Sequence, residues 1–283
     1  MKKNRKAAAL TAGPAAVWFL VFVVIPIAYV IGISFLEMRN RHFVAHITLK
    51  NYASIFSSLY LSVYARSFMI AFFNTVICIL LGYPYAFLIA RSGPKKRRML
   101  TNLMMIPLYT NSIVRLGGWK DILDRKGYLN TFLMNLGLIR EPITFMYTNG
   151  AVIFGMVYIL LPFMVLPLVS SIGRLDWNLI EASYDLGGNR RKTFFRVMLP
   201  LTRSGLFSGS IMVFVPTMAY YYISDFMGGA KHKLIGNTIQ TQFQESYNWP
   251  LGAAFSVILL LMTLVLILIY SRGGGKKESI ELM

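Results

Sequence analysis

Long apolar runs separated by shorter polar segments make up most of the chain. A helix needs about 20 apolar residues to cross roughly 30 Å of hydrocarbon. Six segments approach that length, near residues 14–36, 68–90, 99–117, 149–171, 204–225 and 251–271. The third is interrupted by polar residues and proline, at Asn102, Pro107, Asn111 and Arg115. The pattern predicts an all-α polytopic membrane protein, with six transmembrane helices in one domain over residues 14–271.

The first run follows a basic start, MKKNRK, and resembles a secretory signal. Its apolar part continues through Ile33 to Leu36, longer than a typical signal core, so we expect a retained helix. Prolines occur within several runs, at Pro26, Pro84, Pro107, Pro162, Pro167 and Pro216. A proline frees a backbone carbonyl, which lipid tolerates only where a neighbouring helix or a wet cavity satisfies it. This favours a bundle around a pathway, with ordinary kinks in a scaffold bundle as the alternative.

A polar interruption, EASYDLGGNRRKTFFRVMLP, covers residues 181–200. Asp176 can cap a helix over roughly 177–186, because its carboxylate accepts from the free amides of the first turn. Gly187 and Gly188 then end that helix, since a left-handed cap costs least at glycine. A second helix is expected from Arg190 to Pro200. The apolar residues of this projecting pair must fold back on the bundle or enter a groove of a partner.

The composition agrees with a membrane protein and excludes other classes. Hydrophobic residues make up 56% of the chain and charged residues 14%, with a net charge of +18. The basic residues lie between the apolar runs and form no continuous basic face, so nucleic-acid binding is not expected. The single cysteine, Cys78, excludes a disulfide framework within the chain. The spans lack paired acids, a Ser/His pair or HExxH, so no catalytic residue is predicted; His42 and His46 lack a third ligand, so no metal site is predicted.

Lys and Arg are distributed unequally between the two sides of the predicted spans. The segments on one side, including both termini, carry 18 of the 29 cations, and the other side carries 11. The densest group is RSGPKKRR at 91–98. The positive-inside rule places the richer side in the cytoplasm of a cell-membrane protein. We therefore predict cytoplasmic tails over 1–13 and 272–283, and a cytoplasmic position for residues 172–203.

The spacing within residues 181–200 resembles the EAA motif of importer-type ABC permeases. Glu181, Ala182 and Ser183 are followed by three residues, Gly187, nine residues, and then VMLP ending at Leu199 and Pro200. The family favours alanine where this chain has Ser183. The resemblance implies that residues 176–200 form a coupling helix pair that enters a groove on an ATPase subunit. The implied coupling residues are Glu181, Ala182, Ser183, Gly187, Leu199 and Pro200.

Further segments extend the resemblance over nearly the whole chain. They are NSIVR at 111–115, KGYLN at 126–130, YILLPFMVLPL at 158–168, SDFMGGAK at 224–231, LIGN at 234–237 and WPLGAA at 249–254. They resemble PotB-type permeases of spermidine/putrescine importers. The resemblance implies a type I ABC importer (MetI-like) fold and polyamine import by alternating access. It also implies two PotA-like ATPase subunits, a PotC-like second permease and a PotD-like binding protein.

ATP and magnesium are expected on the ATPase partner. The present chain has no GxxxxGK[ST] phosphate loop, so no cofactor is predicted within it.

A path for polyamines should offer aromatic faces and few acids. A cation–π contact of about 0.5–2 kcal/mol guides a cation without trapping it. The best match is YYYISD at 220–225, where Tyr221 and Tyr222 precede Asp225 by four and three residues. We expect the three on one helical face at the outer end of the fifth span, where an ionisable residue is a functional candidate. The alternative is an interfacial aromatic belt, with Asp225 capping the helix.

Two other functions stay open at this stage. Related permeases for iron, sulfate or other organic solutes share the implied fold. A membrane channel or scaffold without an ATPase would also contain several spans, although the EAA-like spacing speaks against it. Co-purification of an ATPase distinguishes the scaffold from the importer.

Overall fold

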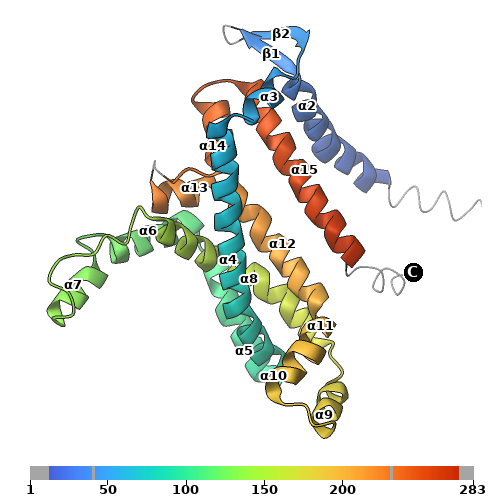
Figure 1. Cartoon of the computed structure of the whole chain (residues 1–283), viewed down its shortest axis with the longest axis vertical. Helices are drawn as coiled ribbons and strands as arrows, with labels where there is room; N and C mark the ends of the chain where they lie inside the picture. The colour runs from blue at the N-terminus through green and yellow to red at the C-terminus, as the bar shows by residue number, and fades with distance from the viewer. Residues whose placement is uncertain (1–12, 40–41, 230–231, 274–283) are drawn as a thin grey trace, which may run out of the picture. The chain divides into compact units, whose positions relative to one another are not determined.

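The computed structural model describes residues 13–39, 42–229 and 232–273, which are mostly helical (Figure 1). The predicted tails, 1–13 and 272–283, fall outside the described residues except for Gly13 and the last two residues of the final helix. The chain divides into two compact units. One comprises residues 1–62 and 238–262, and the other comprises residues 63–237 and 263–283.

The first unit begins with an apolar helix over Gly13–Ser34, which contains a π-helical turn, η1 (Leu20–Val24), and then α2 (Ile25–Ser34). Strands β1 (Leu36–Arg39) and β2 (His42–Ile47) and helix α3 (Lys50–Ile55) follow. Asn51 of α3 donates hydrogen bonds from its amide to the carbonyls of Ser34 and Leu36, both at 2.9 Å. This side chain therefore fixes the direction in which the chain leaves the first apolar helix.

The two strands depart from the predicted all-α fold. They are antiparallel and pair Leu36 with Ile47 and Arg39 with His42. β2 contains Phe43, Val44 and Ile47, which are residue types that favour strands. A search for runs of about 20 apolar residues does not detect strands of four and six residues. The chain is mostly helical, as predicted, and this hairpin departs from the all-α prediction.

The second unit contains most of the remaining helices. In chain order they are the larger part of α4 (Ser58–Arg91), α5 (Pro94–Met105), the 3-10 helix η2 (Ile106–Tyr109), α6 (Ser112–Leu123), α7 (Tyr128–Asn135), α8 (Asn149–Gly173), α9 (Trp177–Asp185), α10 (Arg190–Thr193), the π-helical η3 (Phe194–Met198), α11 (Leu199–Leu201), α12 (Arg203–Ala219), α13 (Tyr221–Ile223) and the π-helical η4 (Ser224–Gly228). Helices α14 (Ile235–Gln244) and α15 (Trp249–Gly273) each have residues in both units.

Helices α8 and α12 pack closely at the centre of the second unit. Met164 and Leu168 of α8 are fully buried. Gly205 and Gly209 of α12 lie against the same helix, because a Cβ added to them would come within 2.4 Å of Ser171 Cβ and 2.7 Å of Met164 Sδ. Small residues four positions apart let membrane helices approach closely. The segments before and after α12 extend from this closely packed pair.

Among the described residues, four helices are long and apolar enough to cross a membrane: Gly13–Ser34, Ser58–Arg91, Asn149–Gly173 and Trp249–Ile269. A bent pair, Arg190–Leu201 with Arg203–Ala219, forms a candidate fifth span with a 71° break. The expectation of several apolar spans, and hence of a multi-pass membrane protein, is confirmed. The helices match four of the predicted segments within a few residues, except that α4 begins ten positions before residue 68.

The third predicted span, 99–117, is not one continuous helix. α5 ends at Met105, a short 3-10 turn contains Pro107, and Thr110 is extended with φ −101° and ψ 148°. Asn111 then caps α6 by accepting from the backbone amide of Ile113 at 2.8 Å. A proline and a capping asparagine within six residues stop one helix and start another. The polar interruptions visible in the sequence are thus the sites of a structural break.

Candidate functional site

The first of the two helices predicted over residues 176–200 is α9, and it is capped as expected. The Asp176 carboxylate accepts a hydrogen bond from the backbone amide of Asn178 at 3.0 Å. Ile180 is buried, and the Trp177 ring lies 6.0 Å from the ring of Phe87 on α4. On the other side, Glu181 and Ala182 are exposed. One face of α9 is thus fixed to the bundle while the EA pair faces outward.

Other apolar side chains of this segment face outward with the EA pair. Leu179 and Tyr184 are each 47% exposed, and Leu186 is 89% exposed. The sequence left open whether the apolar residues fold back or meet a partner. In the structure, the part near Ile180 folds back on the bundle, and the part near Leu186 is left uncovered. An uncovered apolar surface of this kind is typical of an interaction site.

The turn after α9 depends on two glycines. Gly187 has φ 78°, the left-handed conformation that the sequence predicts, and its amide donates to the Tyr184 carbonyl at 2.9 Å. The amide of Gly188 donates to the Ser183 carbonyl at 2.8 Å. Asn189 then caps α10, its side-chain oxygen accepting from the Lys192 amide at 2.9 Å. These bonds satisfy backbone groups at the end of one helix and the start of the next.

The second helix predicted in this segment, from Arg190 to Pro200, is divided into α10, η3 and α11. Pro200 lies within α11, and α12 begins at Arg203, one residue before the predicted start of the fifth span at 204. Leu199 is half-buried and Pro200 exposed. The Ser183 and Thr193 hydroxyls are hydrogen-bonded at 3.0 Å and join α9 to α10. The serine that replaces the favoured alanine thus has a structural role, and no pattern in the sequence pointed to Thr193 as its partner.

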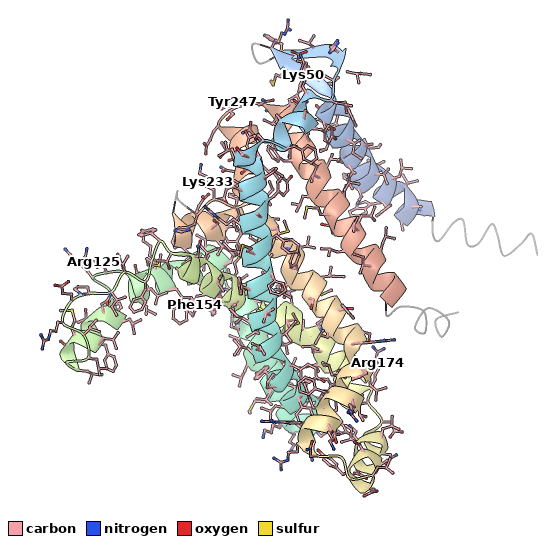
Figure 2. All side chains as sticks on the ribbon, in the orientation of Figure 1. Lys50, Arg125, Phe154, Arg174, Lys233 and Tyr247 are labelled. Carbon is pink, nitrogen blue, oxygen red and sulfur yellow. The ribbon has the colours of Figure 1, made fainter. Side chains whose placement is uncertain are left out.

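Tyr83 of α4 holds the second of the paired helices, a name used from here on for α9 and the α10–η3–α11 segment. Its ring lies 5.2 Å from the Phe194 ring, and its hydroxyl is hydrogen-bonded to the Thr202 hydroxyl at 2.8 Å. Figure 2 labels Arg174, the C-cap residue of α8, where the chain turns toward α9. In Figure 1, α9 and α10 project from the ends of α8 and α12. The projecting pair is therefore held by hydrogen bonds and ring contacts to helices of the bundle.

The structure brings the predicted substrate residues together at the opposite end of α12. Tyr221 and Tyr222 have ring centroids 6.2 Å apart, and the Tyr222 hydroxyl donates to Ser112 Oγ at 3.3 Å. Asp225 is exposed, as is Tyr221 at 39%. The prediction that these residues continue the fifth span is wrong, because α12 ends at Ala219 and Tyr220 has ψ 76°. They lie on a separate short helix, α13, and the following π-helical turn η4.

Asn237 organises this cluster and was not singled out from the sequence. Its amide nitrogen donates to Asp225 Oδ1 at 2.6 Å and to the Tyr221 carbonyl at 3.1 Å. Its side-chain oxygen accepts from the Leu234 amide at 2.8 Å. Asn237 is 1% exposed, and a buried amide whose donors and acceptor are all used holds its neighbours in one arrangement. The LIGN segment thus positions the carboxylate of Asp225.

Arg115 of α6 is a charged side chain held against an aromatic ring. Its guanidinium carbon lies 5.4 Å from the centre of the Tyr158 ring on α8. Nε and Nη1 are buried, and within the described part of the chain neither has a hydrogen-bond partner. The Trp119 ring lies 5.7 Å from the same tyrosine. A cation–π contact stabilises such a desolvated cation by about 2 kcal/mol.

Comparison with known proteins places these features in context. The family model for "Binding-protein-dependent transport system inner membrane component" matches residues 79–272. The chain is 44% identical to the spermidine/putrescine transport system permease protein PotB of Escherichia coli (strain K12), over 93% of this chain and 98% of that protein. It is 43% identical to the protein of the same name from Haemophilus influenzae, over 96% and 95% of the two chains.

Solved structures share the fold at lower sequence identity. One chain in the crystal structure of a bacterial alginate ABC transporter, in complex with an alginate pentasaccharide-bound periplasmic protein, matches with a TM-score of 0.76 and 14% identity. That match covers 95% of this chain and 94% of the other. A chain of the MetNI methionine ABC transporter matches with a TM-score of 0.53 and 17% identity, over 73% and 90%. The architecture is therefore the MetI-like permease fold.

Proposed function

Because the chain belongs to the family of binding-protein-dependent transport system inner membrane components, we propose that it is the permease subunit of an ATP-driven importer of spermidine and putrescine. The observation that carries this proposal is the 44% identity to Escherichia coli PotB across 98% of that protein. The chain acts as a transport subunit and not as an enzyme. ATP and magnesium bind to a PotA-like ATPase, which supplies the energy.

The proposed assembly contains two PotA-like ATPase subunits, a PotC-like second permease and a PotD-like binding protein. Closure of the ATPase subunits moves the paired helices, and the spans rock between inward-facing and outward-facing states. Glu181 and Ala182 meet the ATPase, and a basic residue there would pair with Glu181. Support comes from the anchoring of Trp177 against Phe87 on α4, with ring centroids 6.0 Å apart. A projecting element transmits movement only when it is held firmly by the helices that must move.

We place residues 172–203 and both termini in the cytoplasm, with six crossings in total. The sixth crossing is the broken segment α5–η2–α6. Its basic start lies beside the end of α8, because a Cβ added to Gly173 would be 3.5 Å from Arg97 Nη2. Its Ser112 accepts from Tyr222, which follows the opposite end of α12. The segment therefore runs from one end of the α8–α12 pair to the other.

The proposed path for the polyamine passes Tyr221, Tyr222 and Asp225. Two neighbouring tyrosine rings and one exposed carboxylate offer weak, successive attraction to the ammonium groups of a flexible polycation. Asn237 donates to one oxygen of the carboxylate and keeps its position. A single acid attracts a polyamine without holding it as an array of carboxylates would. This arrangement suits a site that must both accept and release its substrate.

The proposal is tested by reconstituting the chain with its second permease, ATPase and binding protein and measuring ATP-driven uptake of labelled spermidine. Putrescine should compete, while sulfate and ferric ion should not. Asp225→Asn should lower spermidine uptake at least several-fold with assembly and basal ATP hydrolysis intact. The asparagine keeps an oxygen acceptor for Asn237 but removes the charge. Uptake of an unrelated solute in preference to polyamines would overturn the proposed substrate.

Asp121→Asn serves as the matched control. Asp121 is an exposed carboxylate on α6 that is not part of the proposed path. Its substitution removes the same charge and should leave uptake unchanged. Equal uptake by wild type and Asp225→Asn would discard the role of Asp225 while leaving the permease function in place. Absence of any ATPase from the purified assembly would instead favour the channel or scaffold.

A further inference from the structure

Helix α7 carries an apolar stripe that the described part of the chain leaves uncovered. Tyr128, Phe132 and the C-cap residue Leu136 follow one another at intervals of four residues, so they share one face of the helix. They are 76%, 60% and 57% exposed. Thr131 and Asn135 are exposed too, and helical spacing places them on the adjoining face. The outer surface of α7 is therefore amphipathic, with an apolar side and a polar side.

A network centred on Asn130 fixes α7 against the end of α6. The side-chain nitrogen of Asn130 donates to the carbonyls of Asp124 at 3.1 Å and Ile143 at 2.8 Å, and its side-chain oxygen accepts from the Ile143 amide at 2.9 Å. Asn130 is 1% exposed. The N-cap residue Gly127 approaches α6 so closely that an added Cβ would lie 2.5 Å from the Asp121 carbonyl oxygen. The stripe thus belongs to a firmly built element and not to a loose loop.

The contacts of α6 with α8, a helix long and apolar enough to span a membrane, place this element near the membrane surface. The centre of the Trp119 ring on α6 lies 4.7 Å from that of Phe154 and 5.7 Å from that of Tyr158. These two residues follow the first residue of α8 by five and nine positions, about 8 and 14 Å along the helix at 1.5 Å per residue. Half of the hydrocarbon core is about 15 Å thick, so α6 lies within the depth of one leaflet. Because α7 begins at Tyr128, five residues after α6 ends at Leu123, it starts close to the same surface.

Exposed cations flank the stripe at both ends. Arg125, labelled in Figure 2, and Lys126 precede α7, and Arg140 follows it. Within the described residues none of the three forms an ion pair, and the neighbouring acids, Asp124 and Glu141, form none either. Lys and Arg beside an apolar helix face are attracted to the headgroups of a membrane. Charge and apolar surface on α7 are thus arranged as in helices that lie along a membrane surface.

We propose that α7 lies in the interface of the bilayer that the chain spans, with Tyr128, Phe132 and Leu136 turned into the acyl region. The cations that flank the stripe lie among headgroup phosphates, and the polar side is turned to water. A membrane surface accounts for both the apolar stripe and the unpaired cations, and the fold already brings it next to α8. Seating of α7 also fixes the end of α6, the helix on which Ser112 contacts Tyr222. The inference requires that α8 spans the membrane and is independent of the transported solute and of the ATPase.

The test measures depth with a nitroxide label on a single cysteine in the Cys78→Ala background of the full chain, purified into nanodiscs of phosphatidylcholine and phosphatidylglycerol. Oxygen collects in the hydrocarbon and a nickel chelate stays in water, so their effects on the relaxation of the label report its depth. The label on Phe132→Cys should be reached mainly by oxygen and lie about 5–10 Å below the headgroup boundary. Thr131→Cys is the matched control, because it is the neighbouring residue on the polar side, and its label should be reached mainly by the chelate.

Two charge substitutions test the seating of the stripe itself. Phe132→Asp places a carboxylate on the apolar side and should shift a label on Leu136→Cys from the hydrocarbon to water, because burying an unpaired charge is costly. Thr131→Asp adds the same charge on the polar side and should leave the label on Leu136→Cys at its depth. Elution as a single species in size-exclusion chromatography checks that each variant is folded.

Two outcomes would overturn the proposal. Equal access of the nickel chelate to the labels on Phe132→Cys and Thr131→Cys would place α7 in water. Loss of access of both reagents to the label on Phe132→Cys, when the second permease or the binding protein is added, would assign the stripe to that protein partner. Polyamine uptake is measured separately, and the importer function would stand after either result.

Discussion

At the scale of single residues, the turn between α9 and α10 gives its two glycines different tasks. Gly187 has φ 78°, yet no heavy atom lies within 4 Å of where its Cβ would be. Gly188 lies outside the left-handed region, but its added Cβ would be 2.4 Å from the Ser183 carbonyl oxygen. The first position requires a left-handed backbone and the second requires space. Substitution at either one therefore disturbs the turn for a different physical reason.

This difference predicts distinct tolerances at the two positions. Gly187→Asn should keep ATP-driven uptake near wild type, because asparagine adopts the left-handed conformation at low cost. Gly187→Val should strain the turn by roughly 1–2 kcal/mol and lower both uptake and the amount of ATPase that co-purifies. Gly188→Ala should also lower both, because the turn must open to admit the methyl group. If Gly187→Val retained wild-type uptake, the docking role of the turn would be rejected.

At the scale of elements, the close approach of α8 and α12 determines how firmly the functional segments are held. The paired helices precede α12 and the tyrosine–aspartate cluster follows it, so both depend on where this helix lies. Gly205 and Gly209 place the α12 backbone against Ser171 and Met164. In lipid the hydrophobic effect does not drive helices together, so close packing of this kind is what holds α8 and α12 against each other.

Gly209→Leu should separate the two helices and lower thermal stability in detergent, with a loss of about 1–3 kcal/mol for an overpacked site. The matched control is Gly32→Leu in α2, where no heavy atom lies within 4 Å of an added Cβ and the residue is exposed. The control should leave the melting temperature near that of wild type. Equal melting temperatures for both variants would contradict the proposed close contact.

The length of the apolar runs predicted the long helices, because a helix must be apolar over about 20 residues to cross the hydrocarbon core. Gly187 and Gly188 predicted the turn, because few other residues accept its geometry. The break near Pro107 was visible only as an irregularity, since sequence does not say whether a proline kinks or ends a helix. The end of α12 at Ala219 was missed because Tyr220 to Ile223 contains no glycine, proline or charged residue that would mark the end of a helix.

The contacts that organise the two sites depend on folding. Ser183 meets Thr193, and Asp225 meets Asn237, across ten and twelve residues. No helical periodicity links positions so far apart when a turn lies between them. The side chains with recognisable chemistry could be predicted, whereas the partners that position them could not.

At the scale of the whole molecule, the distribution of cations predicts which end of the bundle faces the cytoplasm. Arg91 is the last residue of α4, Arg97 lies in the first turn of α5, and Arg203 is the first residue of α12. A cation that crosses the bilayer loses hydration, and the side with more Lys and Arg is accordingly retained in the cytoplasm. The proposed docking of the ATPase requires the same orientation, because ATP is cytoplasmic.

This orientation is tested with single cysteines in a Cys78→Ala background, which removes the one native thiol. Arg125→Cys, in the segment between α6 and α7 (Figure 2), should react with a membrane-impermeant maleimide added outside spheroplasts, because Arg125 is exposed and belongs to the predicted outer side. Asp185→Cys, at the exposed end of α9, should react only after permeabilisation. Reaction of both thiols in permeabilised cells is the control for accessibility. Labelling of Asp185→Cys in intact spheroplasts would place the paired helices outside, where no ATPase could reach them.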